Sequence, residues 1–147
     1  MIEASICSPP TPGGPKGLWY LAHPYTGDER ANFDDSVRVF GACMKRGYGV
    51  FNPIGHSHAP SGVYPEMAER RGVDVWLELD MLIILRTQWD GLILCPGWEE
   101  SRGCRAERRA FCELQQRASL AGEPVPRIIE LAEALAEPVD PRFEEAT

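Results

Sequence analysis

Residues 90–107 are DGLILCPGWEESRGCRAE, an apolar run followed by a turn and then by a polar run. The first six residues are almost continuously apolar, as is typical of a parallel strand that is covered on both faces of its sheet. Pro96 and Gly97 favour a turn, and Ser101 is a good N-cap for a helix over roughly residues 101–121. A buried strand that leads through a turn into a helix is the repeating unit of α/β folds.

The rest of the chain repeats this alternation. Four segments have the apolar density of strands: residues 17–22, 48–52, 90–95 and, more weakly, 125–130. Four segments suit helices: residues 28–46, 73–87, 101–121 and 131–136, although LIIL at 82–85 alone could equally be a strand. In the first helix, apolar residues recur at steps of three and four: Phe33, Val37, Phe40 and Met44. The sequence therefore predicts an α/β, flavodoxin- or Rossmann-like three-layer sandwich around a mainly parallel central sheet.

The length of 147 residues suits a single domain with its own core. Residues 1–16 are rich in Pro and Gly and are expected to form a flexible leader, followed by the domain at 17–137 and an acidic tail at 138–147. The segment PIGHSHAPSG at 53–62 is a loop by composition, and its length favours a functional or mobile loop.

The composition narrows the class of function. A formal net charge of −7 argues against binding to a nucleic-acid polymer, although one helix N-terminus or one Arg can still hold a phosphate. The five cysteines, without a C-x-x-C pair, are better explained as free thiols in a reducing cytosol than as a disulfide framework. No signal peptide and no apolar run of membrane-spanning length is evident, so we expect a cytoplasmic protein without a membrane partner.

The carboxyl ends of parallel strands are where α/β sheets bind their ligands. The loops after Ala22, Asn52 and Cys95 should therefore meet at one edge of the sheet. In the third loop, the amides that follow the Ser101 cap could hold an anion such as a phosphate or a carboxylate.

Glu107 is the first candidate for chemistry at this edge. Gly103 lies four residues earlier on the same helical face, and helical side chains lean toward the N-terminus, so Gly103 leaves room for a ligand above Glu107. A Gly in a helix lowers its stability by roughly 1 kcal/mol relative to Ala. Space for a ligand would explain why Gly occupies position 103 despite this loss. The spacing fits equally well a solvated helix on which Glu107 pairs with one of its neighbours Arg102, Arg105, Arg108 and Arg109.

Asp80 is the second candidate carboxyl group. On the 73–87 helix it shares one stripe with apolar residues: Val73, Trp76, Leu77, Ile83 and Ile84. A carboxylate on an apolar face must be paired, hydrogen-bonded or protonated, because an unpaired buried charge costs several kcal/mol. Asp80 is therefore either a functional acid or a structural acceptor for backbone amides.

The histidines and aromatic residues near this edge suit a ligand better than a metal. His56 and His58 form an H-x-H pair without a third ligand at a recognisable spacing, so we expect neither a metal nor a cofactor. They could contact a substrate or simply be loop residues. Tyr20, Tyr25 and Trp98 lie beside the expected binding edge, where an aromatic wall would suit a nucleobase.

Three stretches of the chain resemble the nucleoside 2-deoxyribosyltransferase-like superfamily. They are YLAHPYTG at 20–27, GYGVFNPIGHSH at 47–58 and LCPGWEESRGCRAE at 94–107. Within the superfamily, the chain is most similar to small bacterial and phage members with the pattern P-G-W-x-x-S-x-G-x-x-x-E, and the resemblance spans about residues 18–130. It implies a sandwich that cleaves or exchanges the N-glycosidic bond of a nucleoside or nucleoside 5′-monophosphate, usually as a homo-oligomer.

The resemblance also implies roles for the matched residues. The nucleophilic Glu of the superfamily falls on Glu107, and the Tyr that positions it falls on Tyr20. The acid that protonates or orients the base falls on Asp80. The Ser and Gly that contact a 5′-phosphate fall on Ser101 and Gly103.

The loop histidine of the superfamily falls on His56 or His58, and His23 departs from the pattern because it stands where a small residue is expected.

Cleavage of the C1′–N bond builds positive charge on the sugar, which a carboxylate can stabilise or capture. A second carboxyl group with a raised pKa can protonate the departing base. Two other functions stay open: a nucleotide-binding or sensing module without turnover, and an enzyme that splits nicotinamide from NAD.

Overall fold

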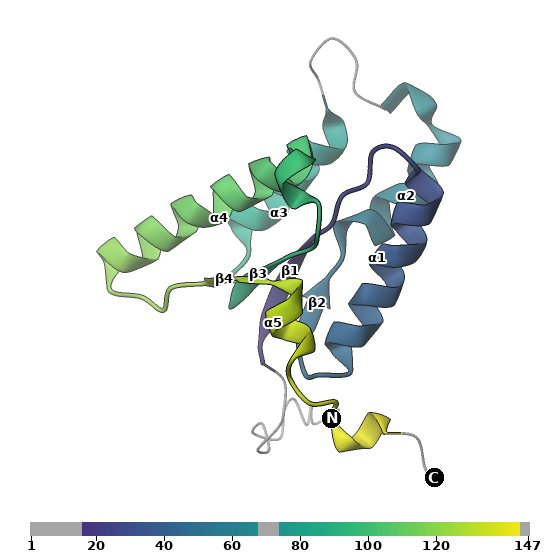
Figure 1. The fold of residues 1–147 in the computed structure, drawn as a ribbon. Coiled ribbons are helices and arrows are strands. Elements are labelled where there is room, and N and C mark those ends of the chain that lie inside the picture. Colours follow the sequence, from purple (N-terminus) through teal and green to yellow (C-terminus); the bar gives the residue numbers. More distant parts are fainter. Residues whose placement is uncertain (1–15, 68–73, 145–147) are drawn as a thin grey trace, which may run out of the picture.

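The computed structural model describes residues 16–67 and 74–144, which form a three-layer α/β sandwich (Figure 1). Within these residues the central sheet has four parallel strands in the order β2-β1-β3-β4. The strands are β1 (Leu18–Ala22), β2 (Gly49–Phe51), β3 (Gly91–Leu94) and β4 (Arg127–Glu130). The predicted fold class, a Rossmann- or flavodoxin-like sandwich with a parallel sheet, is confirmed.

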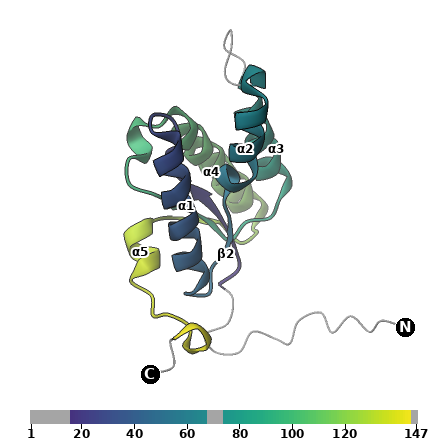
Figure 2. The same ribbon diagram turned by 90° about the vertical axis from the view of Figure 1, so that its right-hand side faces the viewer.

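Helices cover both faces of the sheet. One face packs on α1 (Glu29–Met44) and α5 (Leu131–Leu135), and the other face packs on α3 (Val75–Arg86) and α4 (Arg102–Ala121). Figure 2 shows α1 and α5 in front of the sheet and α4 behind it. A further helix, α2 (Pro53–Val63), packs against α1 and β1.

The two-sided cover explains the continuous apolar runs in the sequence. Along β1, Trp19 and Leu21 enter the core under α1 and α5, whereas Tyr20 and Ala22 enter the core under α3 and α4. All four side chains are buried, so the strand shows no alternation of polar and apolar residues. The residues expected at 82–85 as either helix or strand belong to α3.

The apolar spacing predicted α1 but not its buried face. The helix buries Ser36, Val39 and Cys43, whereas Val37 and Met44 are exposed. Small residues at positions 36 and 43 let the helix approach the sheet closely, so packing overrides the larger apolar residues on the neighbouring face.

The prediction that residues 53–62 form a loop is wrong, because they form α2. Pro53 occupies the first helical position, where a backbone N–H would have no intrahelical partner and the fixed φ of Pro is favourable. Pro60 lies inside the helix. The hydroxyls of Ser57 and Ser61 turn inward and donate to the carbonyls of Pro53 and Ser57, at 3.2 and 2.6 Å. Burial of Pro53, Ile54 and Ser57 outweighs the loop-like composition.

Four cysteines are free thiols as expected: Cys43, Cys95 and Cys104, which are buried, and Cys112, which is partly exposed. Cys7 and Val73, with residues 1–15 of the expected leader and 145–147 of the expected tail, lie outside the described residues. None of the helices in the described ranges is long and apolar enough to span a bilayer.

Candidate active site

A cavity of about 510 Å³ opens where the loops after β1 and β3 meet helices α2, α3 and α4. This is the edge at which a parallel sheet presents the carboxyl ends of its strands. Its volume lies in the range of small-molecule sites, roughly 300–1,000 Å³. Its wall carries polar or charged groups from each of these loops and from two of the helices: His23, Tyr25, Asp74, Asp80, Ser101 and Glu107.

Glu107 is fixed in this wall by Tyr20. The Tyr20 hydroxyl donates a hydrogen bond of 2.7 Å to Glu107 Oε1. Tyr20 is fully buried, and its ring packs against Phe51, Trp89 and Phe111, so the hydroxyl cannot move freely. Glu107 itself is only 6% exposed. It therefore lies on the buried face of α4 and not on a solvated face, as the alternative interpretation required.

Burial raises the pKa of the Glu107 carboxyl to about 8, while the hydrogen bond from Tyr20 opposes this rise and the nearby Asp80 adds to it. A carboxyl group with this pKa is mostly protonated in the empty site at neutral pH. A positive charge that develops beside it would favour its ionised form, so the environment is suited to a cationic transition state.

Asp80 faces the same cavity from α3 with a side chain that is 14% exposed. Burial, followed by the charge of Asp74, raises the Asp80 pKa to about 7. His56 Nε2 lies 3.4 Å from Asp80 Oδ1, and both atoms are buried without a hydrogen-bond partner. Burial lowers the pKa of His56, so near neutral pH a largely neutral imidazole faces a carboxyl group that is only partly ionised, and the contact is not a full ion pair. Asp80 can therefore keep a proton available at neutral pH.

The N-terminus of α4 forms the third part of the wall. Ser101 Oγ accepts a hydrogen bond of 3.2 Å from the Cys104 amide, which makes Ser101 the predicted N-cap. A Cβ atom placed on Gly103 would meet only Ser101 Oγ, at 4.0 Å, so the space beside Gly103 is open cavity. Amides in the first turn of a helix have no intrahelical acceptor and favour an anion.

Gly103→Ala is therefore expected to separate stability from ligand binding. The added methyl group projects into the cavity without a protein clash, and Ala stabilises a helix relative to Gly by up to about 1 kcal/mol. We expect an unchanged or raised melting temperature, together with binding of an anion such as a nucleoside 5′-monophosphate that is weaker by about tenfold or more, measured by thermal melting and calorimetric titration. Unchanged binding would show that no ligand uses this space.

With this geometry in view, comparison with protein families matches residues 17–123 to the family described as Domain of unknown function (DUF1937). The chain belongs to this family. A comparison with curated proteins finds no match. The family description states no activity.

Sequence reasoning missed much of the wall as site residues, and two polar examples are His23 and Asp74. His23 Nε2 lies 2.7 Å from Asp35 Oδ2, and His23 Nδ1 lies 2.7 Å from the Pro24 carbonyl oxygen, so the ring is clamped at both nitrogens. Asp74 caps α3 by accepting a 3.0 Å hydrogen bond from the Leu77 amide. An Asp before an apolar helical run is a recognisable cap signal that could have drawn attention to Asp74.

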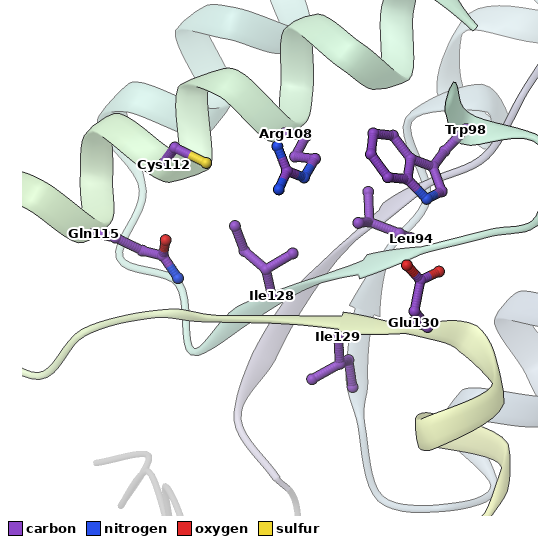
Figure 3. A pocket seen from close by; sticks show the side chains of 8 residues that line it. All are labelled: Leu94, Trp98, Arg108, Cys112, Gln115, Ile128, Ile129 and Glu130. Atoms are coloured by element: carbon purple, nitrogen blue, oxygen red, sulfur yellow. The ribbon is translucent and has the colours of Figure 1, made fainter. Parts of the chain in front are cut away.

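The remaining candidates lie outside the cavity wall. His58 stacks on Phe33 with ring centroids 4.0 Å apart, and its Nδ1 lies 2.9 Å from the Tyr25 hydroxyl. It therefore orients Tyr25, which lines the cavity, without lining the cavity itself. His56 contacts Asp80 in a similar supporting position. Trp98 borders a different hollow together with Arg108 (Figure 3). The structure thus brings Tyr25, Ser101 and Gly103 to the cavity, but not His56, His58 or Trp98.

Proposed function

We propose that this protein cleaves or exchanges the N-glycosidic bond of a nucleoside or nucleoside 5′-monophosphate, as the resemblance to the nucleoside 2-deoxyribosyltransferase-like superfamily implies. The observation that carries the proposal is the presence of two carboxyl groups in one cavity, the buried Glu107 held by Tyr20 and the mostly buried Asp80 on α3. Most enzymes that cleave glycosidic bonds use two carboxyl groups, one as the nucleophile and the other as the acid.

In this mechanism Glu107 acts at C1′ of the sugar. Its Oε1 accepts the Tyr20 hydrogen bond, which leaves Oε2 as the oxygen that attacks C1′ or stabilises its positive charge. The electron pair of the C1′–N bond moves to the base, and the carboxyl group of Asp80 supplies the proton that the base nitrogen requires. Water then releases the sugar and returns a proton to Asp80, or a second base takes the place of water.

This division of roles requires the pair to hold one proton, located on Asp80. The pKa values near 7 for Asp80 and near 8 for Glu107 mean that the pair loses its protons around neutral pH, as a coupled unit. Positive charge at C1′ draws the negative charge of the pair to Glu107 and leaves the proton on Asp80. In the empty site the shared proton lies mainly on Glu107, which has the higher pKa, and bound substrate shifts it to Asp80, where the reaction requires it.

The other walls suit the remaining parts of such a substrate. The first turn of α4, with Ser101 and Gly103, offers amides to an anionic group such as a 5′-phosphate. Tyr25, Ile54 and Trp76 offer aromatic and apolar surface to a base and a sugar.

A screen for base release tests the proposal. The protein is incubated with nucleosides, nucleoside 5′-monophosphates and NAD, and free bases are separated by chromatography. We expect release from at least one nucleoside or nucleoside monophosphate. Free nicotinamide from NAD alone would support the dinucleotide enzyme instead, and thermal stabilisation without any release at high protein concentration would support a binding module.

We also propose that the protein is a homo-oligomer that buries the outer face of α3. Leu79, Leu82 and Leu85 recur at steps of three along this helix and are all exposed, and exposed apolar patches of this kind often mark protein interfaces. Leu82→Glu is expected to reduce the molar mass measured by light scattering to that of a monomer. A monomeric wild-type protein would contradict the proposal.

A further inference from the structure

A second hollow of about 330 Å³ lies on the α4 side of the sheet, beside the edge strand β4 (Figure 3). It shares no lining residue with the candidate active site. The two are nevertheless close along the chain, because Trp98 follows Gly97 of the active-site wall and Arg108 follows Glu107. The hollow is therefore a separate place where a ligand could bind.

The floor of this hollow is apolar and its sides are charged. Leu94 from β3 and Ile128 from β4 form the floor. Arg108 descends into the hollow from α4, the Glu130 carboxylate points into it from β4, and the Trp98 ring closes one end (Figure 3). A cation and an anion thus border one small apolar space.

These polar groups are not satisfied by the protein. Arg108 lies over the Trp98 ring at 5.2 Å from its centroid. Among the residues that the structure describes, neither Arg108 nor Glu130 forms a hydrogen bond or an ion pair, with each other or with another residue. Trp98 Nε1 is buried without an acceptor. Buried polar groups are normally paired, so the Trp98 donor is unusual, whereas the Arg108 and Glu130 side chains are exposed at the rim and are available to a ligand.

We propose that the hollow binds a small zwitterion with an apolar body, that is, a free α-amino acid with an aliphatic side chain. Its carboxylate accepts hydrogen bonds from the Arg108 guanidinium, whose planar donors match a carboxylate. Its ammonium group donates to Glu130, and its side chain lies on Leu94 and Ile128.

The charges decide between this class and simpler ligands. A plain anion would satisfy Arg108 but would be repelled by Glu130, and a plain amine would meet the opposite difficulty at Arg108. The volume lies at the lower end of the range for small-molecule sites, which suits a single amino acid better than a dinucleotide.

Calorimetric titration of the full chain with L-leucine tests the proposal. We expect saturable binding that weakens about tenfold or more in Arg108→Gln and in Glu130→Gln, as the loss of a hydrogen bond to a charged group predicts. Arg109→Gln, at the next position of α4 and outside the hollow, serves as the matched control and should bind leucine within about twofold of the wild type.

Two ligand controls sharpen the result. 4-Methylpentanoate lacks the ammonium group of leucine and 3-methylbutylamine lacks its carboxylate, so each should bind about tenfold more weakly or not at all. No saturable binding of leucine, or binding that both substitutions leave unchanged, would overturn the proposal. Because no nucleoside is present, the outcome does not depend on the function proposed for the other cavity.

Discussion

Glu107→Gln is expected to lower kcat for base release by about 10³-fold or more, because it removes the only charge that can support C1′ in the proposed mechanism. Gln has nearly the shape of Glu and keeps a carbonyl oxygen that can accept the hydrogen bond from Tyr20. The cavity wall should therefore keep its form while the reaction is lost. Chromatographic measurement of free base under saturating substrate checks the result.

The same substitution should make the protein more stable, and increasingly so as the pH rises. Burial raises the pKa of Glu107 from its ordinary 4.5 to about 8. A raised folded-state pKa contributes stability that is fully present below the unfolded pKa and is lost as pH rises through the folded pKa. Each unit of difference is worth about 1.4 kcal/mol, and Gln is free of this loss. The melting temperature of Glu107→Gln should exceed that of the wild type more at pH 8 than at pH 5.

Glu113→Gln is the matched control for both measurements. Glu113 lies on the same helix, is exposed and lines neither cavity, so activity and melting temperature should stay close to those of the wild type. Retained base release in Glu107→Gln would contradict the nucleophile assignment. Loss of activity together with a lower melting temperature would show that Glu107 is needed for the fold instead.

The fold was predictable where one physical requirement dominates a segment. The runs at 17–22 and 90–95 are apolar because both faces of β1 and β3 are covered, and this pattern allows few alternatives. The prediction of a loop at residues 53–62 was wrong because their composition favours turns, whereas packing against α1 and β1 makes them helical. The local sequence does not predict such tertiary contacts.

The candidate site was predictable to a similar degree. The cap at Ser101 and the open space at Gly103 follow from local helix rules. The hydrogen bond between Tyr20 and Glu107 joins residues 87 positions apart, so no local pattern indicates it, and only the family resemblance implied that Tyr20 positions Glu107. Trp98 is directed away from the cavity after Gly97, whose φ of 86° is a left-handed conformation that turns the chain.

Asp80→Asn is expected to lower kcat by about 10²- to 10⁴-fold on substrates whose base leaves as a neutral molecule, the usual effect of losing a general acid. Substrates with an N7-methylated purine should lose much less, because a base that already carries positive charge departs without a proton. Comparing the two substrate classes in wild type and Asp80→Asn measures this difference. Glu78→Gln, an exposed position on the same helix, is the matched control.

The pH dependence gives an independent check on Asp80. Its pKa is raised to about 7 and it acts in the protonated form, so the wild-type rate on neutral bases should fall as pH rises above neutrality. This fall should be absent for N7-methylated substrates and in Asp80→Asn. An equal loss of rate on both substrate classes would assign Asp80 to positioning. The proton for the leaving base would then have to come from another donor, such as a water molecule in the cavity.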